Sequence, residues 1–464
     1  MSPLYQSLQG GNDDTQDNGS YYESYCCSQC SDAHHGTGRL RGGGSSSSAD
    51  NSQGRVYYLN KKAEEQESWV KLGQQFEKET GIPVQIQVAA NYDETLRSEM
   101  AKKEAPTMFQ ADGPSFMNQW KAYAADMSQS DLYKNLSDDY KNRVLNNDDG
   151  KPIAIPYAVE SYGIIYNKAL LNKYFESSWS SVKSIDELNN FKALKAAADE
   201  IQEHKDEMGV KGAFSSPGMD GSSSFRFFFH LPTVPLFYEY KQDGVDMNTV
   251  PASVKGTYVK NMKNIWDLYI TDTTVEPSTI SGKTMDDSTA EFATGQAVFF
   301  QDGVWIYNQL KGQSVADEDL GVLPIYIGVK GEEKQGLNQV ISNYWVVNSK
   351  ASQADQQATQ KFLSWLITND KARKTISQDM GLVTPFTTFD DPVYQVNNPL
   401  VNANREYQDK GFEGVVNVPN PSHQWEQDLG GALLNYTQGN GGWDAVTKVF
   451  TDNWAKEYKL SYAQ

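Results

Sequence analysis

Residues 156–168 read PYAVESYGIIYNK and carry more structural information than any other segment of the chain. After the proline the chain is expected to be extended, the run that follows Gly163 is apolar and rich in β-formers, and the last two residues can open a helix. Such a segment can leave one α/β lobe and enter a second, with Glu160 and Tyr162 at the junction. Because ligands favour the space between domains, we predict that this junction faces a ligand site.

The length and charge of the chain limit the classes of protein to which it can belong. It has 464 residues, which is too long for one ordinary core and suits two lobes of about 200 residues each. The net charge is −19, from 60 acidic and 41 basic residues, and an acidic surface repels phosphate backbones. We therefore expect no nucleic-acid partner. No run of about 18 apolar residues is present, so the sequence predicts no membrane-spanning segment.

The first 53 residues differ from the rest in composition. They are rich in Gly, Ser, Asp and Gln without periodicity, which predicts a disordered leader and tether. No metal site is expected there, because no folded second shell surrounds the three cysteines of the chain, Cys26, Cys27 and Cys30. No basic and apolar signal segment precedes the glycine- and serine-rich run, although that run is typical of the tether of a bacterial lipoprotein. We hypothesise that residues 1–41 are a misread or replaced leader.

The beginning of the folded body alternates strands and helices. Residues 55–59 and 84–88 predict strands, and residues 68–80 between them predict a helix that ends at Gly81. A third strand is predicted over residues 105–110. Strand, helix and strand in this order form a right-handed unit, so we expect a parallel sheet.

Polar residues follow the carboxyl ends of these strands, where ligands bind in open α/β sheets. Residues 60–62 follow the first strand, Asn91 follows the second and Asp112 follows the third. Asn91 supplies an amide and Asp112 a carboxylate, and both groups suit a ligand rich in hydroxyl groups. Alternatively, these two residues cap helices or shape turns.

The rest of the chain predicts a second lobe and a return to the first. Residues 184–187, SIDE, form a capping box that predicts a helix running to about Glu203. A strand over residues 322–326 could lead back toward the first lobe. The predicted boundaries are 1–53 for the leader and tether, 54–158 plus 325–370 for the N-lobe, and 159–324 plus 371–464 for the C-lobe.

Residues 292–305, FATGQAVFFQDGVW, form the second informative segment. They read as a helix end, a glycine stop, a short buried strand and a polar turn that carries Trp305. A buried structural tryptophan is one interpretation. We favour a stacking tryptophan presented at a helix start beside the ligand, with Asp302 in the turn and with Gly303 allowing the backbone to approach the ligand closely.

Catalytic signatures are scarce. The chain has only five histidines, and it lacks the metalloprotease, nucleophile-elbow, phosphate-loop and dinucleotide-binding motifs as well as EF-hand spacing. We therefore predict no catalytic residue, no metal and no cofactor. Two carboxylates placed about 5–10 Å apart could still hydrolyse a glycosidic bond, which leaves a carbohydrate-active hydrolase as an alternative.

Residues 54–400 resemble, segment by segment and in order, the bacterial extracellular solute-binding proteins of sugar ABC transporters and are similar to maltose-binding proteins. The segments that carry the resemblance are Thr80–Ile82, Glu104–Thr107, Tyr157–Lys168, Phe292–Trp305, Leu323–Pro324 and Asn343–Trp345. The family commonly has Asp where this chain has Thr107, and the family's leader is missing.

The resemblance implies an α/β fold of the type II periplasmic-binding-protein class. Its two hinge-linked lobes would each be a mainly parallel sheet flanked by helices, with the ligand between them. In the family pattern Glu160 matches the hinge carboxylate that hydrogen-bonds sugar hydroxyls, and Trp305 matches the stacking aromatic residue. Asp112, Tyr162 and Trp345 follow as further ligand-binding residues by position.

The resemblance also implies a role. The chain would be a monomeric, non-catalytic receptor that captures an oligosaccharide outside the cytoplasm and delivers it to the permease subunits of an ABC transporter. We expect a cell-surface lipoprotein of a Gram-positive bacterium, in contact with the membrane only through a lipid anchor. Another reading keeps the fold but replaces the sugar by a polyamine or a peptide.

Overall fold

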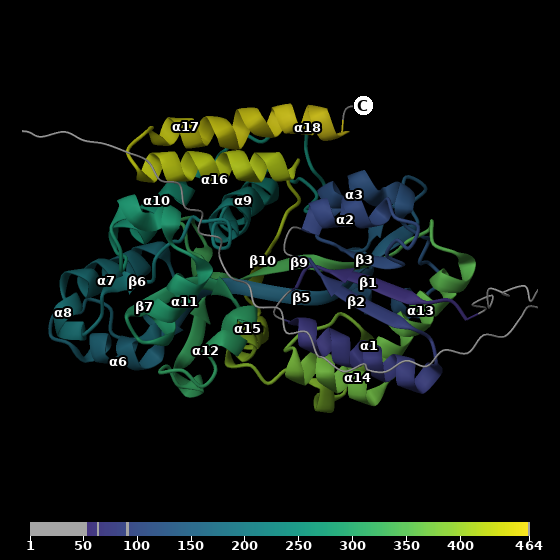
Figure 1. The fold of residues 1–464 in the computed structure, drawn as a ribbon. Coiled ribbons are helices and arrows are strands. Elements are labelled where there is room, and N and C mark those ends of the chain that lie inside the picture. The colour runs from purple at the N-terminus through teal and green to yellow at the C-terminus, as the bar shows by residue number, and fades with distance from the viewer. Residues whose placement is uncertain (1–52, 63–64, 90–91, 463–464) are drawn as a thin grey trace, which may run out of the picture. The chain divides into compact units, whose positions relative to one another are not determined.

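The computed structural model describes residues 53–62, 65–89 and 92–462, and all structural statements concern this part of the chain. Its strands form one ten-stranded sheet with helices around it (Figure 1). The strand order is β2-β1-β3-β9-β5-β7-β6, with β10 beside β9 and with β4 and β8 beside β5. The three cysteines and Asn91 lie outside the described residues.

The first lobe is built around the parallel strands β1, β2 and β3. Its elements are β1 (Val56–Asn60), α1 (Gln66–Thr80), β2 (Val84–Val88), α2 (Tyr92–Met100), β3 (Met108–Ala111), α3 (Pro114–Trp120), α4 (Asp131–Asn135), α5 (Asp138–Lys141), β4 (Leu145–Asn146), α13 (Gln353–Thr368) and α14 (Asp370–Lys374). Strand β1 pairs in parallel with both β2 and β3, as the strand–helix–strand pattern predicts.

The period-two pattern of β1 explains how both faces of the sheet are covered. Val56 and Tyr58 pack in one core cluster with residues of α1 and α13, whereas Leu59 packs in another with residues of α2 and α3. Successive side chains of a strand point to opposite faces. Figure 1 accordingly shows α2 and α3 on one side of β1–β3 and α1 on the other.

The second lobe is larger and has more helices. Its elements are α6 (Lys168–Glu176), α7 (Phe191–Glu203), α8 (Lys205–Met208), β6 (Gly212–Phe214), the π-helical turn η4 (Arg226–His230), α9 (Thr233–Asp243), α10 (Val259–Thr271), α11 (Met285–Ala293), β7 (Ala297–Gly303), the 3-10 turn η6 (Val304–Ile306), α12 (Tyr307–Leu310), β8 (Leu320–Leu323), α15 (Pro399–Asp409), β10 (Glu413–Val416), α16 (His423–Thr437), α17 (Trp443–Lys448) and α18 (Trp454–Tyr462).

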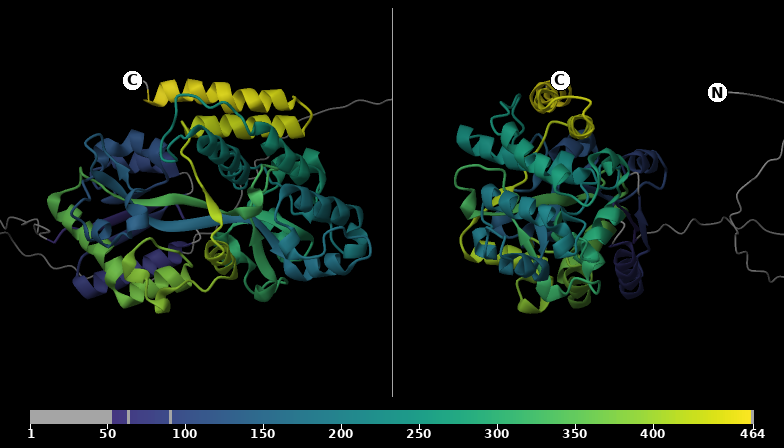
Figure 2. Two further views of the ribbon diagram at one scale, coloured as in Figure 1. Left: turned by 180° about the vertical axis from the view of Figure 1, so that it is seen from behind. Right: turned by 90° about the vertical axis from the view of Figure 1, so that its left-hand side faces the viewer.

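Two long strands, β5 (Pro152–Asn167) and β9 (Gln335–Val347), join the lobes (Figures 1 and 2). In β5, Ile155 packs in the first lobe's core and Ile164 in the second lobe's core. The prediction that residues 156–168 pass from one lobe to the other is therefore confirmed. Since the chain runs out along β5 and back along β9, this pair is antiparallel, and the sheet as a whole is mixed.

The predicted helix start at residues 184–187 is wrong. Ile185–Glu187 forms a single 3-10 turn, and the Ser184 side chain makes no capping hydrogen bond. Helix α7 begins at Phe191, after the Asn190 side chain, which accepts a hydrogen bond from Ala193 N at 3.0 Å. The Glu187 carboxylate accepts from Lys183 N at 3.1 Å instead of closing a capping box.

The core clusters show where the chain changes lobe. Ile325 and Ile327 still pack in the second lobe, and the return to the first occurs within β9, before Trp345. The segment from Ala372 to Tyr394 packs in the first lobe's core. The chain then enters the second lobe at Val396, which packs with residues of β7 and β8.

Candidate functional site

A small pocket collects side chains from both lobes and from the strand between them. It is lined by Glu65, Val159, Glu160, Val304, Trp305, Asn308 and Met380–Val383. Residues 380–383 and Glu65 come from the first lobe, and Val304, Trp305 and Asn308 from the second. Glu160 and Trp305, the two residues that the resemblance places at the ligand, therefore share one pocket.

The Glu160 carboxylate is held from two sides. Its Oε1 accepts a hydrogen bond from Lys62 Nζ at 2.8 Å, and its Oε2 accepts from Asn343 Nδ2 at 2.7 Å. The same Lys62 ammonium lies 3.6 Å from Oε1 of Glu65. The side chains of Lys62 and Glu160 are only 10% and 8% exposed, so this ion pair is poorly screened by water.

Residues at the carboxyl ends of the first lobe's strands fix Asn343 in turn. Its Oδ1 accepts a hydrogen bond from Gln110 Nε2 at 2.8 Å, and Gln110 is the third residue of β3. Oε1 of Gln110 accepts from Lys61 N at 3.3 Å, just after β1. The direction of the Glu160 carboxylate is therefore set by the protein before any ligand arrives.

Trp305 forms an apolar wall of the pocket. It lies in η6, directly after β7, and its partly buried ring packs against core residues of the second lobe. A Cβ atom on Gly303 would lie 2.1 Å from two carbons of the Trp305 ring. Gly303 thus makes room for the indole itself, and not for a ligand as the sequence suggested, while the helix-start position of Trp305 is as predicted.

Replacing Gly303 by Ala is expected to displace the Trp305 ring, because a Cβ contact at 2.1 Å is far inside van der Waals contact. We expect the near-ultraviolet circular dichroism to change and the free energy of unfolding to fall by about 1–3 kcal/mol, as for other overpacked sites. Gly431→Ala is the control, since a Cβ there meets nothing within 4 Å. A crystal structure of the Gly303 variant with the indole unmoved would contradict this account.

Tyr162 and Asp302 are buried and do not line the pocket, so their direct contact with a ligand stays a prediction. Tyr162 is 0% exposed, and its hydroxyl donates a hydrogen bond to the backbone oxygen of His230 at 3.1 Å. Its ring stacks on the His230 ring with centroids 4.1 Å apart. Asp302 is 1% exposed and faces Arg226 inside the second lobe.

Trp345 packs in the core of the first lobe and does not line the pocket, so its contact with a ligand also stays a prediction. It is 1% exposed, and its ring stacks on Tyr157 with centroids 4.3 Å apart and an interplanar angle of 8°. Its Nε1 donates a hydrogen bond to the Tyr58 hydroxyl at 3.2 Å. Both the ring and the polar atom are therefore already used within the fold.

Asp112 lies outside the pocket, in solvent at the end of β3. Its side chain is 48% exposed, and its Oδ2 lies 3.3 Å from Lys61 Nζ. It also lies close enough to α16 to act on His423. A hydrogen bond to Glu426, with smaller contributions from Asp93 and Asp112, raises the pKa of His423 above its ordinary value. Whether Asp112 contacts a ligand stays a prediction, and Asn91 lies outside the described residues.

Sequence reasoning named residues 60–62 beyond the first strand, which include Lys62, but it missed other residues that shape the pocket. Glu65 lies just further along the chain beyond the carboxyl end of β1, where ligands bind in such sheets. For residues 380–383 no signal existed in the sequence. They reach the pocket because Val159 N donates a hydrogen bond to Val383 O at 2.8 Å, across more than two hundred residues of chain.

A second and larger pocket lies against α6. It has a volume of about 360 Å³ and is lined by Tyr166, Lys168, Leu171, Asn172, Phe175, Glu176 and Lys183–Ile185. All of these residues belong to the second lobe, so movement of one lobe relative to the other would not close on a ligand there. The pocket between the lobes is therefore the better candidate for the functional site.

The chemistry of the site between the lobes is that of binding. Glu160 offers lone pairs that accept hydroxyl protons, and Trp305 offers a flat apolar face. Among the described residues no group of three or more His, Cys, Asp and Glu side chains could hold a metal ion. A fixed carboxylate beside an aromatic ring suits a ligand with polar edges and apolar faces.

Residues 71–403 match the family model of the bacterial extracellular solute-binding proteins. The chain belongs to this family. The family consists of solute-binding proteins of ABC transporters, which decides against the hydrolase alternative, and its members act outside the cytoplasm. No helix in the described part of the chain is both long and apolar enough to cross a membrane.

Several solved structures are similar to this chain over most of its length. A family 1 extracellular solute-binding protein from Bifidobacterium longum subsp. infantis is 18% identical and aligns over 87% of this chain and 100% of its own, with a TM-score of 0.59. The receptor GacH of Streptomyces glaucescens is 17% identical over 88% and 99%, with a TM-score of 0.66. A substrate-binding protein of Listeria monocytogenes, solved with cycloalternan, is 17% identical over 89% and 99%, with a TM-score of 0.61. The type II binding-protein fold with two lobes follows from these matches.

Proposed function

We propose that this protein binds an oligosaccharide between its two lobes and delivers it to the permease of a carbohydrate ABC transporter. The observation that carries the proposal is the shared pocket of Glu160 and Trp305. Glu160 would accept hydrogen bonds from sugar hydroxyls, and the C–H face of a sugar ring would stack on Trp305. The solved neighbours support a sugar as ligand, since GacH is described with acarbose and the Listeria protein with cycloalternan. A further similar structure, the solute-binding protein RafE, is described in complex with raffinose.

The pocket also supports a hinge mechanism. It encloses about 20 Å³, which is room for about one water molecule and not for a sugar ring. The lobes must therefore separate for a sugar to enter. Opening would break the contact in which Ser115 Oγ of the first lobe donates to Asn420 O at 2.6 Å. Contacts from both lobes to the sugar would then favour the closed form, since only differential affinity can drive closure.

We propose lobe boundaries that follow the core clusters. The first lobe would comprise residue 53 to about Ala158 and the chain from about Trp345 to Tyr394. The second lobe would comprise the segment between these two and the chain from Val396 onward. The hinge would then consist of β5, β9 and the connection at residue 395.

We further propose that the protein works as a monomer, tethered to the outer surface of a Gram-positive cell by a lipid. The glycine- and serine-rich run at residues 42–48 supports this proposal, because it has the composition of a flexible tether. Mass spectrometry of the protein from its native host would test it. An unmodified, untethered protein in the culture medium would contradict the lipid anchor.

A thermal-shift screen tests the proposed ligand class. Acarbose, raffinose, maltotetraose and chitotetraose are compared with spermidine and a tetrapeptide, because a ligand that binds only the native state raises the melting temperature. We expect a sugar to stabilise the protein. Stabilisation by spermidine or the peptide alone would contradict the carbohydrate and support another solute.

The variant Trp305→Ala then tests the stacking role with the sugar that the screen selects. We expect the affinity, measured by isothermal titration calorimetry, to fall at least about tenfold, which corresponds to about 1.4 kcal/mol. Trp365→Ala is the control, since Trp365 packs against Phe76 and Phe362 in the first lobe, away from the pocket. Unchanged affinity in the Trp305 variant would exclude stacking on this residue.

A further inference from the structure

The Asp302 carboxylate occupies an unusual place at the end of β7. Its Oδ1 accepts a hydrogen bond from Gly303 N at 2.7 Å. Its Oδ2 lies 3.8 Å from Arg226 Nη1 and has no hydrogen-bond partner among the described residues. The side chain is 0% exposed. A charge that is buried so completely, three residues before the pocket tryptophan, requires an explanation.

Arg226 supplies the opposite charge from η4 and is itself firmly held. Its Nη1 donates a hydrogen bond to Gln301 O at 3.2 Å, and its Nη2 donates to Ser288 Oγ at 3.2 Å. Its guanidinium also lies over the rings of Phe227 and Phe300, 5.1 and 5.3 Å from their centroids. The arginine is therefore bonded to the backbone of the strand that carries Asp302.

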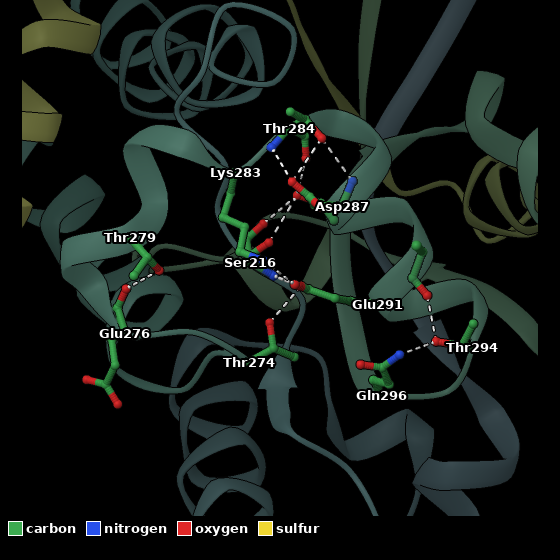
Figure 3. Close-up of polar contacts among 12 residues, drawn as sticks. Ser216, Thr274, Glu276, Thr279, Lys283, Thr284, Asp287, Glu291, Thr294 and Gln296 are labelled. Atoms are coloured by element: carbon green, nitrogen blue, oxygen red, sulfur yellow. Dashed lines mark hydrogen bonds and ion pairs between the residues drawn. The ribbon is translucent and has the colours of Figure 1, made fainter.

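Helix α11 and the loop after β6 form the frame behind Arg226. Ser288 Oγ donates a hydrogen bond to Ser216 O at 2.8 Å. The Glu291 carboxylate accepts from Ser216 N at 2.7 Å and from Thr274 Oγ1 at 2.6 Å, and Figure 3 shows it between these two residues. Because each member has several partners, the frame leaves the guanidinium little freedom to move.

Trp305 packs over Gly303, whose N–H donates to Asp302, and beside the stacked rings of Tyr162 and His230. Burial raises the pKa of Asp302 to about 6, and Arg226 and the Gly303 N–H each oppose that rise. The ring centroids of His230 and Trp305 lie 5.4 Å apart. Burial also lowers the pKa of His230 to about 3, so this ring is neutral near pH 7.

We infer that Asp302, paired with Arg226, is a positioning residue that holds the Trp305 indole over Gly303 as the apolar wall of the pocket. The carboxylate fixes the Gly303 backbone by accepting its N–H at 2.7 Å, the missing side chain of Gly303 admits the face of the indole, and the His230 ring supports it from the interior. The benefit for ligand binding rests on the proposed function. The positioning itself is a property of the ligand-free protein.

Fluorine NMR of protein labelled with 5-fluorotryptophan tests the positioning without any ligand. The Trp305 resonance is assigned by its disappearance in Trp305→Phe. We expect it to titrate with a midpoint near the Asp302 pKa of about 6 and to lose this titration in Asp302→Asn, which also shifts the resonance. Near this carboxylate, Arg226 is a fixed cation and His230 stays neutral above about pH 5, so the midpoint reports Asp302.

Asp272→Asn is the matched control, because burial also raises the pKa of Asp272 to about 6 and the residue ends α10 in the same lobe. This variant should leave the Trp305 resonance and its titration unchanged. A Trp305 resonance that is independent of pH in the wild type overturns the inference, even if Asp302→Asn fails to fold. The same holds if Asp302→Asn leaves the resonance in place or if Asp272→Asn abolishes the titration.

Calorimetry separates this inference from the proposed function. We expect Asp302→Asn to weaken binding of acarbose or raffinose about fivefold at pH 7.5. In the wild type, the affinity for the sugar should decrease below about pH 6, because the Asp302 carboxylate is then protonated. If neither sugar binds the wild type while the Trp305 resonance still titrates through Asp302, the carbohydrate proposal fails and the positioning stands. If both sugars bind with equal affinity to wild type and variant, the positioning has no role in binding and the inference fails.

Discussion

The variant Arg226→Met is expected to lower the free energy of unfolding by about 3–5 kcal/mol, because removal of one partner leaves an uncompensated charge in the protein interior. Arg226 and Asp302 have side chains that are 1% and 0% exposed, so water cannot replace the missing guanidinium. Urea unfolding followed by circular dichroism at pH 7.5 measures the loss.

The double variant Arg226→Met with Asp302→Leu is the control for this prediction. Replacing a buried ion pair by apolar side chains of similar volume is often nearly neutral, so the double variant should recover most of the stability that the single variant loses. A double variant as unstable as the single one would show that the packing of the arginine, and not the charge, stabilises the lobe.

The pH dependence gives a second check on the Arg226 variant. The folded-state pKa of Asp302, about 6, already lies above its ordinary value, so its contribution to stability is full at low pH and is lost as the pH rises through that pKa. Without Arg226, which opposes this rise, the folded-state pKa must rise further. The stability difference between variant and wild type should therefore grow from about pH 5 to pH 8. A difference that is constant over this range would contradict the electrostatic cause.

The second large effect is expected in Glu160→Ala, which should weaken sugar binding about 10- to 100-fold. Hydrogen bonds to charged groups contribute about 1.5–3 kcal/mol, and Glu160 is a carboxylate that lines the pocket. The variant also removes the acceptor that Lys62 Nζ and Asn343 Nδ2 contact at 2.8 and 2.7 Å. Calorimetry with the sugar selected by the thermal-shift screen measures the change.

Two further variants make the Glu160 experiment specific. Glu160→Gln keeps the shape and one acceptor oxygen but cannot accept from both Lys62 and Asn343, so its affinity should lie between those of the wild type and the Ala variant. Glu104→Gln removes a carboxylate of the first lobe that pairs with Arg55 at 3.1 Å and is 71% exposed, and it should leave the affinity unchanged. Equal affinities for wild type and Glu160→Ala would exclude the hinge carboxylate from the ligand site.

Local sequence patterns predicted much of the framework correctly. The end of α1 at Gly81 follows from a residue that accepts a positive φ, here 74°. Strand β2 covers Val84–Val88, the residues for which the sequence predicts a strand. The crossing along residues 156–168 follows from a β-rich run that is too long for an ordinary strand. Each of these features depends on residues that are adjacent in the chain.

The capping box at residues 184–187 shows where such reasoning fails. The pattern is present, but the Glu332 side chain accepts a hydrogen bond from Phe191 N at 2.8 Å, and Asn190 caps the same helix end. A partner 141 residues away thus helps to set where α7 begins. A pattern of four residues contains no information about such a contact.

The residues of the candidate site also fall into those that local sequence indicates and those whose position only the fold decides. The composition of the turn before Trp305 and the carboxylate in the crossing strand were enough to identify Glu160 and Trp305, because both follow from short motifs in order. Whether a side chain meets the pocket or the interior depends on which distant residues cover it. The Tyr157 ring stacks on Trp345, and Arg226 pairs with Asp302 inside the second lobe. The sequence alone therefore could not test whether Trp345 and Asp302 contact a ligand. Burial is a property of contacts between segments far apart in the chain, and only the folded structure supplies it.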